Sequence, residues 1–112
     1  MERYLISFDD GAMTFAEEDL PAVGEAAHAV VKEAQDEGVW VFGGGLQSQQ
    51  ADIVGTDGVV RRDPFPETKA VLGGFAIVEV ASRAQALDWA AKFAVACRCA
   101  QEVRQIMFDP LV

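Results

Sequence analysis

Two short runs of the sequence are apolar at every position, Val39–Phe42 and Phe75–Val78. The side chains of a β-strand alternate between the two faces of its sheet, so a strand is apolar throughout when both of its faces are buried. Three glycines follow the first run and two precede the second, as expected where strands are interrupted. The chain should therefore build a sheet with two apolar faces, and the rest of the sequence must cover them.

An amphipathic segment after the first strand is predicted to form a helix on one of these faces. Its apolar residues recur at helical spacing over Leu20–Ala34, and Gly38 follows as a C-cap glycine. Two starts are open for this helix. Thr14–Glu17 has capping-box spacing, and Asp19 is an alternative N-cap.

The remaining core elements follow from alternation and capping signals. Arg3–Asp9 alternates as a half-buried strand does, Gly73–Val80 is the strongest strand pattern, and Glu102–Phe108 is expected to close the sheet. A capping box at Ser82–Gln85 predicts a second helix that runs to about Val95. Each helix is therefore expected between two strands.

A small hairpin is predicted between the two halves of the chain. Ala51–Val54 and Val59–Arg61 flank Asp57-Gly58, and Asp-Gly between short strands is a strong hairpin signal. The full order predicts an α+β fold in a single domain, residues 1–112. It is a ferredoxin-like βαβ-βαβ antiparallel sheet with two helices on one face and a small inserted hairpin.

The second face of this sheet requires a cover that the chain itself does not supply. Two helices can cover one side of a four-stranded sheet, and an apolar face left in water would exceed the few hundred Å² that a monomer tolerates. A second copy of the chain is the simplest cover. The sequence therefore predicts a homodimer.

Charge and length exclude several classes of function. The chain has 18 acidic and 9 basic residues, a formal charge of −9, and its bases are scattered. Because phosphate neutralisation supplies most non-specific affinity for nucleic acids, no nucleic-acid partner is expected. No stretch approaches the roughly 20 apolar residues of a membrane helix. The N-terminus has no features of a signal peptide, so no membrane association and a cytoplasmic location are expected.

Three blocks of the chain resemble the YCII-related family in its DGPF-motif branch. They are a glycine-rich segment after the first helix, a DGPF-x-ETK…GGF-like segment, and a closing EVR strand. In this chain the blocks are Gly43-Gly44-Gly45-Leu46-Gln47, Pro64-Phe65-Pro66-Glu67-Thr68-Lys69 with Leu72-Gly73-Gly74-Phe75, and Glu102-Val103-Arg104. The chain departs from the motif at Arg62-Asp63, where the family has Asp-Gly.

The resemblance implies a dimeric α/β barrel, in which two sheets pack together and a cavity lies at or near the interface. It also implies a functional link to an extracytoplasmic-function sigma factor. No cofactor is expected. Two hypotheses for function follow. The first is a ligand-binding or regulatory module, and the second is a small cofactor-free enzyme of the lyase, isomerase or hydrolase type.

His28 is the candidate catalytic residue because it is the only histidine, and histidine alone has an unperturbed pKa suited to proton transfer near neutrality. Asp36 is eight residues further along the same helix, about 12 Å away, so the partner carboxylate must come from elsewhere. Asp9, or its neighbour Asp10, at the end of the first strand is the best candidate. The alternative is a histidine at the border of the apolar stripe with no chemical role.

Polar residues near the predicted interface are candidates for ligand binding. Glu67, Thr68 and Lys69 follow a loop that two prolines stiffen, and they either line a cleft for a polar or anionic ligand or serve a structural role. Arg104 is either a carboxylate binder or one half of an ion pair with Glu102. The two cysteines, in Cys97-Arg98-Cys99, have no nearby histidine or further cysteine, so no metal site is expected.

The charge argument gives a direct prediction. In a gel-shift experiment at about 150 mM salt, we expect no complex with duplex DNA at micromolar protein, since a chain of charge −9 without a basic patch releases few counterions. A complex of sub-micromolar affinity at this salt concentration would contradict the argument.

Overall fold

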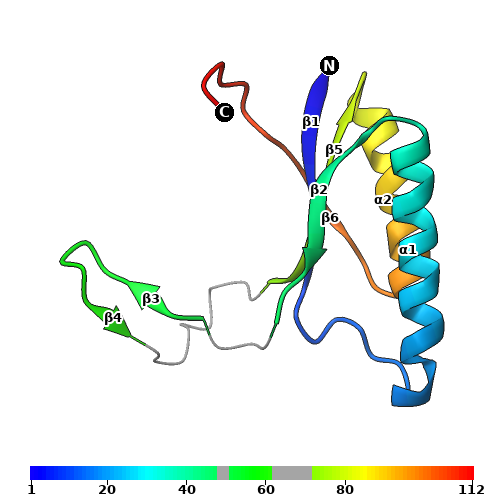
Figure 1. Ribbon diagram of the computed structural model, residues 1–112, viewed down its shortest axis with the longest axis horizontal. Coiled ribbons are helices and arrows are strands. Elements are labelled where there is room, and N and C mark those ends of the chain that lie inside the picture. The colour runs from blue at the N-terminus through cyan, green and yellow to red at the C-terminus, as the bar shows by residue number, and fades with distance from the viewer. Residues whose placement is uncertain (48–50, 62–71) are drawn as a thin grey trace.

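The computed structural model describes residues 1–47, 51–61 and 72–112. Its elements follow the predicted order of strands and helices (Figure 1). They are β1 (Glu2–Asp9), a 3-10 turn η1 (Glu17–Asp19), α1 (Leu20–Asp36), β2 (Trp40–Gly45), β3 (Ile53–Val54), β4 (Val60–Arg61), β5 (Leu72–Val80), α2 (Arg83–Cys97) and β6 (Glu102–Gln105).

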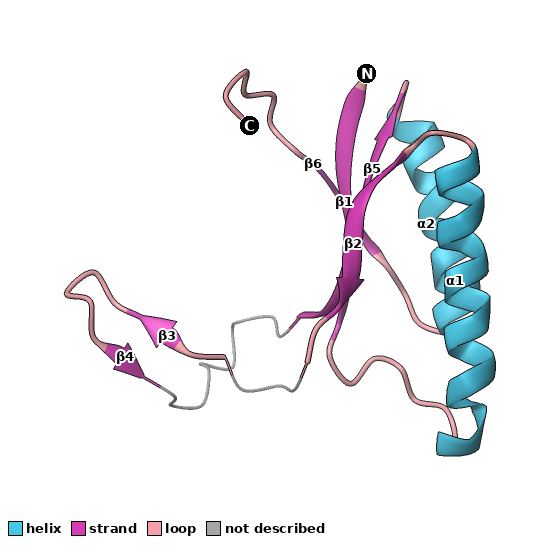
Figure 2. Cartoon of the chain, in the orientation of Figure 1, coloured by secondary structure: helices cyan, strands magenta, loops and turns pink. Residues whose placement is uncertain are grey.

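The main sheet has four strands in the order β2-β5-β1-β6, with every neighbouring pair antiparallel. Both helices lie on the same side of it (Figure 2). This is the ferredoxin-like arrangement that the sequence predicts. The sheet does not close on itself, and the other side is covered by neither helix.

Alternation along β1 and β5 places the core on the helix side of the sheet. Tyr4 and Ile6 are paired in register with Val78 and Ala76, and all four side chains are buried. Trp89 and other apolar residues of α2 pack against them, together with Ala34 of α1. Each fully buried side chain of this kind stabilises the fold by about 1.5–3 kcal/mol relative to its exposed form.

The opposite side of the sheet, hereafter the open face, carries the residues that alternate with the core. Leu5 pairs with Ile77 and with Arg104 of β6, and Phe75 pairs with Gly44 of β2. Leu5, Phe75 and Ile77 are half-buried. The open face is therefore apolar at its centre.

The apolar runs are not buried on both faces within a single chain. In β2, Phe42 is 62% exposed and Val41 is 37% exposed. The reason is that the two helices cover one side only, so the open face stays accessible. The prediction of double burial depends on a partner that covers this face.

The helix ends agree with the capping signals. Gly38 has φ of 74°, the left-handed conformation that a glycine C-cap permits. At the start of α2 the hydroxyl of Ser82 accepts a hydrogen bond from the backbone N–H of Gln85, whose side chain accepts one from Ala81. Helix α1 starts at the second of the two predicted positions, with Asp19 as its N-cap residue. The Asp19 carboxylate makes no cap hydrogen bond and instead accepts one from Arg98 at 3.2 Å.

The predicted hairpin forms at Asp57-Gly58. The Asp57 carboxylate accepts a hydrogen bond from the N–H of Val59, and Gly58 has φ of 79°. β3 and β4 form a separate two-stranded sheet that lies away from the main one (Figure 1). Of the final strand, only Glu102–Gln105 is formed, so the prediction that it extends to Phe108 is wrong. Ile106 still donates a hydrogen bond to the backbone oxygen of Arg3, and the chain leaves the edge of β1 from Met107 onward.

Candidate functional site

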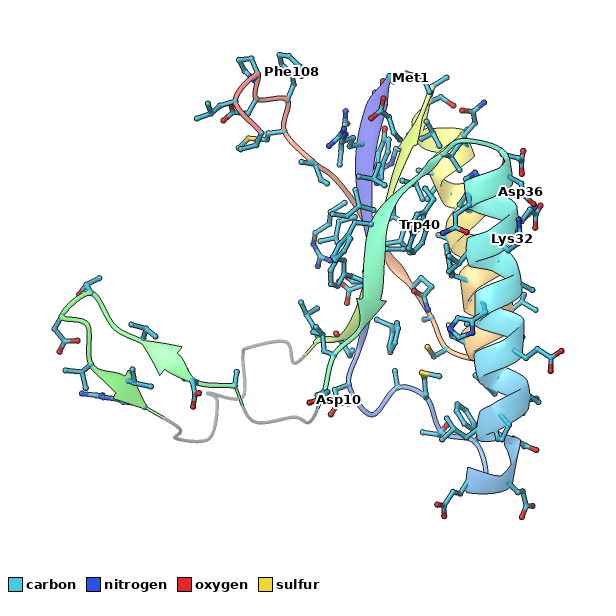
Figure 3. All side chains as sticks on the ribbon, in the orientation of Figure 1. Met1, Asp10, Lys32, Asp36, Trp40 and Phe108 are labelled. Atoms are coloured by element: carbon cyan, nitrogen blue, oxygen red, sulfur yellow. The ribbon has the colours of Figure 1, made fainter. Side chains whose placement is uncertain are left out.

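A cavity of about 690 Å³ lies between α1, α2 and one end of the sheet. Trp40 and Asp10 mark its extent along the sheet, since Trp40 lies between sheet and helices and Asp10 lies just beyond the end of β1 (Figure 3). Most of the wall is apolar. The described residues that line it are Ile6, Phe8, Asp10, Gly11, Met13, Ala27, His28, Val31, Trp40, Gly43, Gly44, Gly45, Gly73, Phe75, Ala76, Phe93, Cys97 and Gln101.

The Phe8 ring takes its place in this wall because the facing strand carries glycine. Phe8 is paired with Gly74 across β1 and β5. A Cβ atom at Gly73 would lie 2.6 Å from the Phe8 ring, and one at Gly74 would lie 2.9 Å from it. No side chain fits at these distances, so the two glycines provide the room that the ring occupies.

Trp40 shapes the wall in the same way on β2. A Cβ atom at Gly43 would lie 2.8 Å from the Trp40 ring and 2.5 Å from the backbone oxygen of Phe75. The Trp40 ring in turn packs beside Phe93 of α2, with their centroids 6.4 Å apart. At Gly45, which also lines the cavity, an added Cβ atom would meet nothing within 4 Å. The glycines of β2 therefore admit an aromatic ring at one position and leave open space at another.

The polar groups of the cavity come from three different parts of the fold. His28 is presented by α1, Asp10 follows β1, and Gln101 precedes β6. His28 lies one position after Ala27 and three before Val31, both of which line the cavity, while its own side chain stays largely exposed. It is therefore at the border of the apolar stripe, as the helical spacing predicts.

The structure brings Asp10 to the cavity with His28, and not Asp9. Asp9 is exposed and pairs with Leu72 at a register shift of the ladder, whereas Asp10 is half-buried and lines the cavity. Among the residues that the structure describes, His28 makes no hydrogen bond or ion pair. The two groups thus share a cavity without direct contact.

The two cysteines are both free thiols, one of them in the cavity wall. Burial raises the pKa of the Cys97 thiol, and the neighbouring Cys99 raises it further. Burial also raises the pKa of Cys99, although a hydrogen bond with the Gln101 amide opposes the change. Both thiols are therefore held in their neutral, less nucleophilic form. Within the described ranges, no group of three His, Cys, Asp or Glu side chains could hold a metal ion.

The other candidate residues lie outside this cavity or outside the described residues. Arg104 is on the open face, where its guanidinium donates a hydrogen bond to the Glu102 carboxylate. This is the ion pair that the sequence offered as an alternative to carboxylate binding. Glu67, Thr68 and Lys69 lie outside the described residues, so their ligand-binding role stays a prediction.

The contribution of Phe8, Trp40 and Gln101 to the site was not anticipated from the sequence. A usable signal existed for Phe8, since an aromatic residue near the end of one strand and a Gly-Gly pair in another suggest a ring packed over glycine. Gln101 carries no such signal, because its place in the wall depends on how the chain returns from α2 to β6.

Comparison with known proteins identifies the family. A family model, the YCII-related domain, matches residues 3–108. The chain therefore belongs to the YCII-related family. A search of curated proteins found no match. Among the described residues, no helix is long and apolar enough to cross a membrane.

The glycine positions can be tested by two alanine substitutions in the same strand. Gly43→Ala should lower the free energy of unfolding by about 2–3 kcal/mol, as overpacking does, because its Cβ would lie 2.5 Å from backbone that a side-chain movement cannot displace. Gly45→Ala, the matched control, should change it by less than about 0.5 kcal/mol because the space there is open. Urea denaturation measures both, and equal losses would contradict the packing argument.

Proposed function

We propose that this chain is a ligand-binding or regulatory module, which binds a small and largely apolar molecule in the cavity between helices and sheet. The observation that carries the proposal is the joint placement of His28 and Asp10 in one apolar-walled cavity of about 690 Å³. Ligand sites are typically cavities of roughly 300–1,000 Å³ with apolar walls and a few polar groups that fix the orientation of the ligand.

The polar groups favour a ligand that carries a hydroxyl or a similar hydrogen-bonding group. The Asp10 carboxylate accepts hydrogen bonds, while the His28 ring and the Gln101 amide can both donate and accept them. No lysine or arginine is among the described residues of the wall, and Asp10 adds a negative charge. We therefore favour an uncharged, largely apolar ligand with one hydrogen-bonding group over the anionic one that the sequence also left open.

A cofactor-free enzyme is the second candidate, because His28 and Asp10 face the same cavity. General acid–base catalysis needs a proton donor or acceptor within about 3.2 Å of its partner or substrate. No hydrogen bond joins His28 and Asp10, so neither orients the other in the chain as it stands. Because this hydrogen bond is missing, we rank ligand binding ahead of catalysis. The link to an extracytoplasmic-function sigma factor stays an expectation from the family.

The proposed module is a homodimer that uses the open face. The chain exposes 7889 Å², about 1,900 Å² more than the roughly 6,000 Å² expected for a compact monomer of its mass. Its radius of gyration is 15.6 Å, against about 13 Å expected for this length. A standard interface buries about 800 Å² of each partner. The projecting β3–β4 hairpin adds to the exposed total, and the open face, with Phe42 62% exposed, is the part of the main sheet that neither helix covers. The cavity lies within one chain, on the other side of the sheet from this surface.

Binding can be tested with p-cresol and toluene, two probes that differ by one hydroxyl. Both should raise the melting temperature of the wild-type protein at millimolar concentration. The His28→Leu substitution should lower the affinity for p-cresol three- to tenfold, the usual contribution of one hydrogen bond. The affinity for toluene should not change.

A variant that narrows the cavity provides the control. Gly45→Val adds a side chain to the cavity wall at a position where an added Cβ meets nothing within 4 Å, and it should weaken binding of both probes without unfolding the protein. If neither probe binds the wild type, or if Gly45→Val leaves binding intact, the cavity is not the site.

The homodimer can be tested by light scattering at micromolar protein. We expect a mass twice the 12.1 kDa of one chain, because the open face and its surroundings expose enough apolar surface to drive association. A mass of one chain at this concentration would rule the homodimer out.

A further inference from the structure

The chain beyond β6 forms a short arm, residues 106–112, on the side of the sheet away from both helices (Figure 1). Its first residue still belongs to the sheet edge, since the N–H of Ile106 donates to the backbone oxygen of Arg3 at 2.9 Å. From Met107 onward the chain leaves β1. In Figure 3, Phe108 lies near the far end of this arm, away from the core.

The arm has a defined conformation. The N–H of Val112 donates to the backbone oxygen of Asp109 at 3.2 Å, and the N–H of Leu111 donates to the Asp109 carboxylate at 2.8 Å. Pro110 occupies the second position of this turn, where its fixed φ is favourable. The turn therefore fixes the backbone of residues 109–112, directly after Met107 and Phe108.

These side chains are apolar and almost fully accessible. Met107 is 88% exposed, Phe108 91%, and Leu111 89%. Single exposed apolar side chains are ordinary on protein surfaces, but a contiguous group presented by a defined turn marks an interaction site.

A matching surface exists on the open face. Its apolar centre consists of Leu5, Phe75 and Ile77, and Phe42 extends it, with its ring centroid 6.0 Å from that of Phe75. Ion pairs border this centre, one between Arg3 and Glu79 and one between Arg104 and Glu102; the Arg3–Glu79 pair measures 2.9 Å. An apolar centre with a polar rim is the usual anatomy of a protein interface.

We propose that the arm of one chain packs against the open face of a second copy, and that the second copy's arm returns the contact. The inference rests on the proposed homodimer and specifies which segment completes it. A twofold arrangement brings the same surfaces together from both sides, so one operation covers two arms and two open faces. Such an exchange would bury apolar side chains that a single chain leaves largely exposed on this side of the sheet, Phe108 of the arm and Phe42 of the open face.

Two aspartate substitutions at comparably exposed apolar positions test the arm. Phe108→Asp alters the arm, whereas Val95→Asp alters the outer surface of α2, where the side chain is 80% exposed. Neither should disturb folding of the chain. Phe108→Asp should raise the dissociation constant of the dimer at least about tenfold, because burying one phenylalanine contributes more than a tenfold change requires. Val95→Asp should leave the dissociation constant unchanged. Sedimentation velocity over a dilution series measures the dissociation constant of both variants.

A photo-crosslinker identifies the surface that the arm contacts. With p-benzoylphenylalanine in place of Phe108, we expect covalent dimers whose crosslinked peptides map to β1, β5 or β2. Mixing nitrogen-15-labelled and unlabelled chains before irradiation distinguishes contacts between chains, which give mixed-isotope pairs, from contacts within one chain. The same photo-crosslinker at Val95 should give no dimer.

The outcomes distinguish failure of the arm proposal from failure of the homodimer proposal. A monomeric wild type contradicts both proposals. A dimer that Phe108→Asp does not weaken contradicts the arm and leaves the homodimer standing. Crosslinks confined to a single chain, or directed to the helices of the other, also contradict the arm.

Discussion

The architecture of this protein depends on a four-stranded sheet that is apolar on two sides and has helices on one. β5 is the clearest case, since its residues from Phe75 to Val80 alternate between half-buried and buried positions. The buried set meets α1 and α2, and the half-buried set forms the centre of the open face. Because side chains alternate strictly along a strand, the helices cannot reach the second set. The open face is therefore a consequence of the topology, and a change of side-chain rotamers cannot cover it.

A second constraint, the packing of aromatic rings over glycine, determines where the cavity lies. Phe8 occupies space that side chains at Gly73 and Gly74 would fill, and Trp40 does the same at Gly43. A sheet with larger residues at these points would close against the helices. The glycine-rich segments that mark the family in sequence thus have a packing role here, which does not depend on backbone flexibility. They leave a volume between sheet and helices that His28 and Asp10 border.

Features set by local chemistry could be predicted from the sequence. The C-cap at Gly38, the capping box at Ser82 and the turn at Asp57-Gly58 each depend on residues within four positions of one another, and all three form as expected. The topology followed from the order of these elements together with the rule that two helices between alternate strands pack on one face.

Features that depend on long-range strand register could not be predicted from the sequence. The ladder between β2 and β5 shifts register between Trp40 and Phe42, so simple alternation does not show which side chains of β2 face the helices. The choice of Asp10 over Asp9 has a similar origin, because the ladder between β1 and β5 is also irregular after Phe8. A shift of one residue moves a side chain to the other face, and adjacent acids look equivalent in sequence.

The cavity and the open face lie on opposite sides of the same sheet, so the proposed ligand site and the proposed dimer surface are separate. His28 belongs to α1 and lines the cavity. Trp40 lies on the helix side of the sheet, while Phe108 of the arm lies on the other side (Figure 3). Phe75 is common to both regions, since it lines the cavity and its ring packs beside Phe42 on the open face. Under both proposals, a ligand and a second chain would occupy different sides of the sheet, and Phe75 is a residue that both would touch.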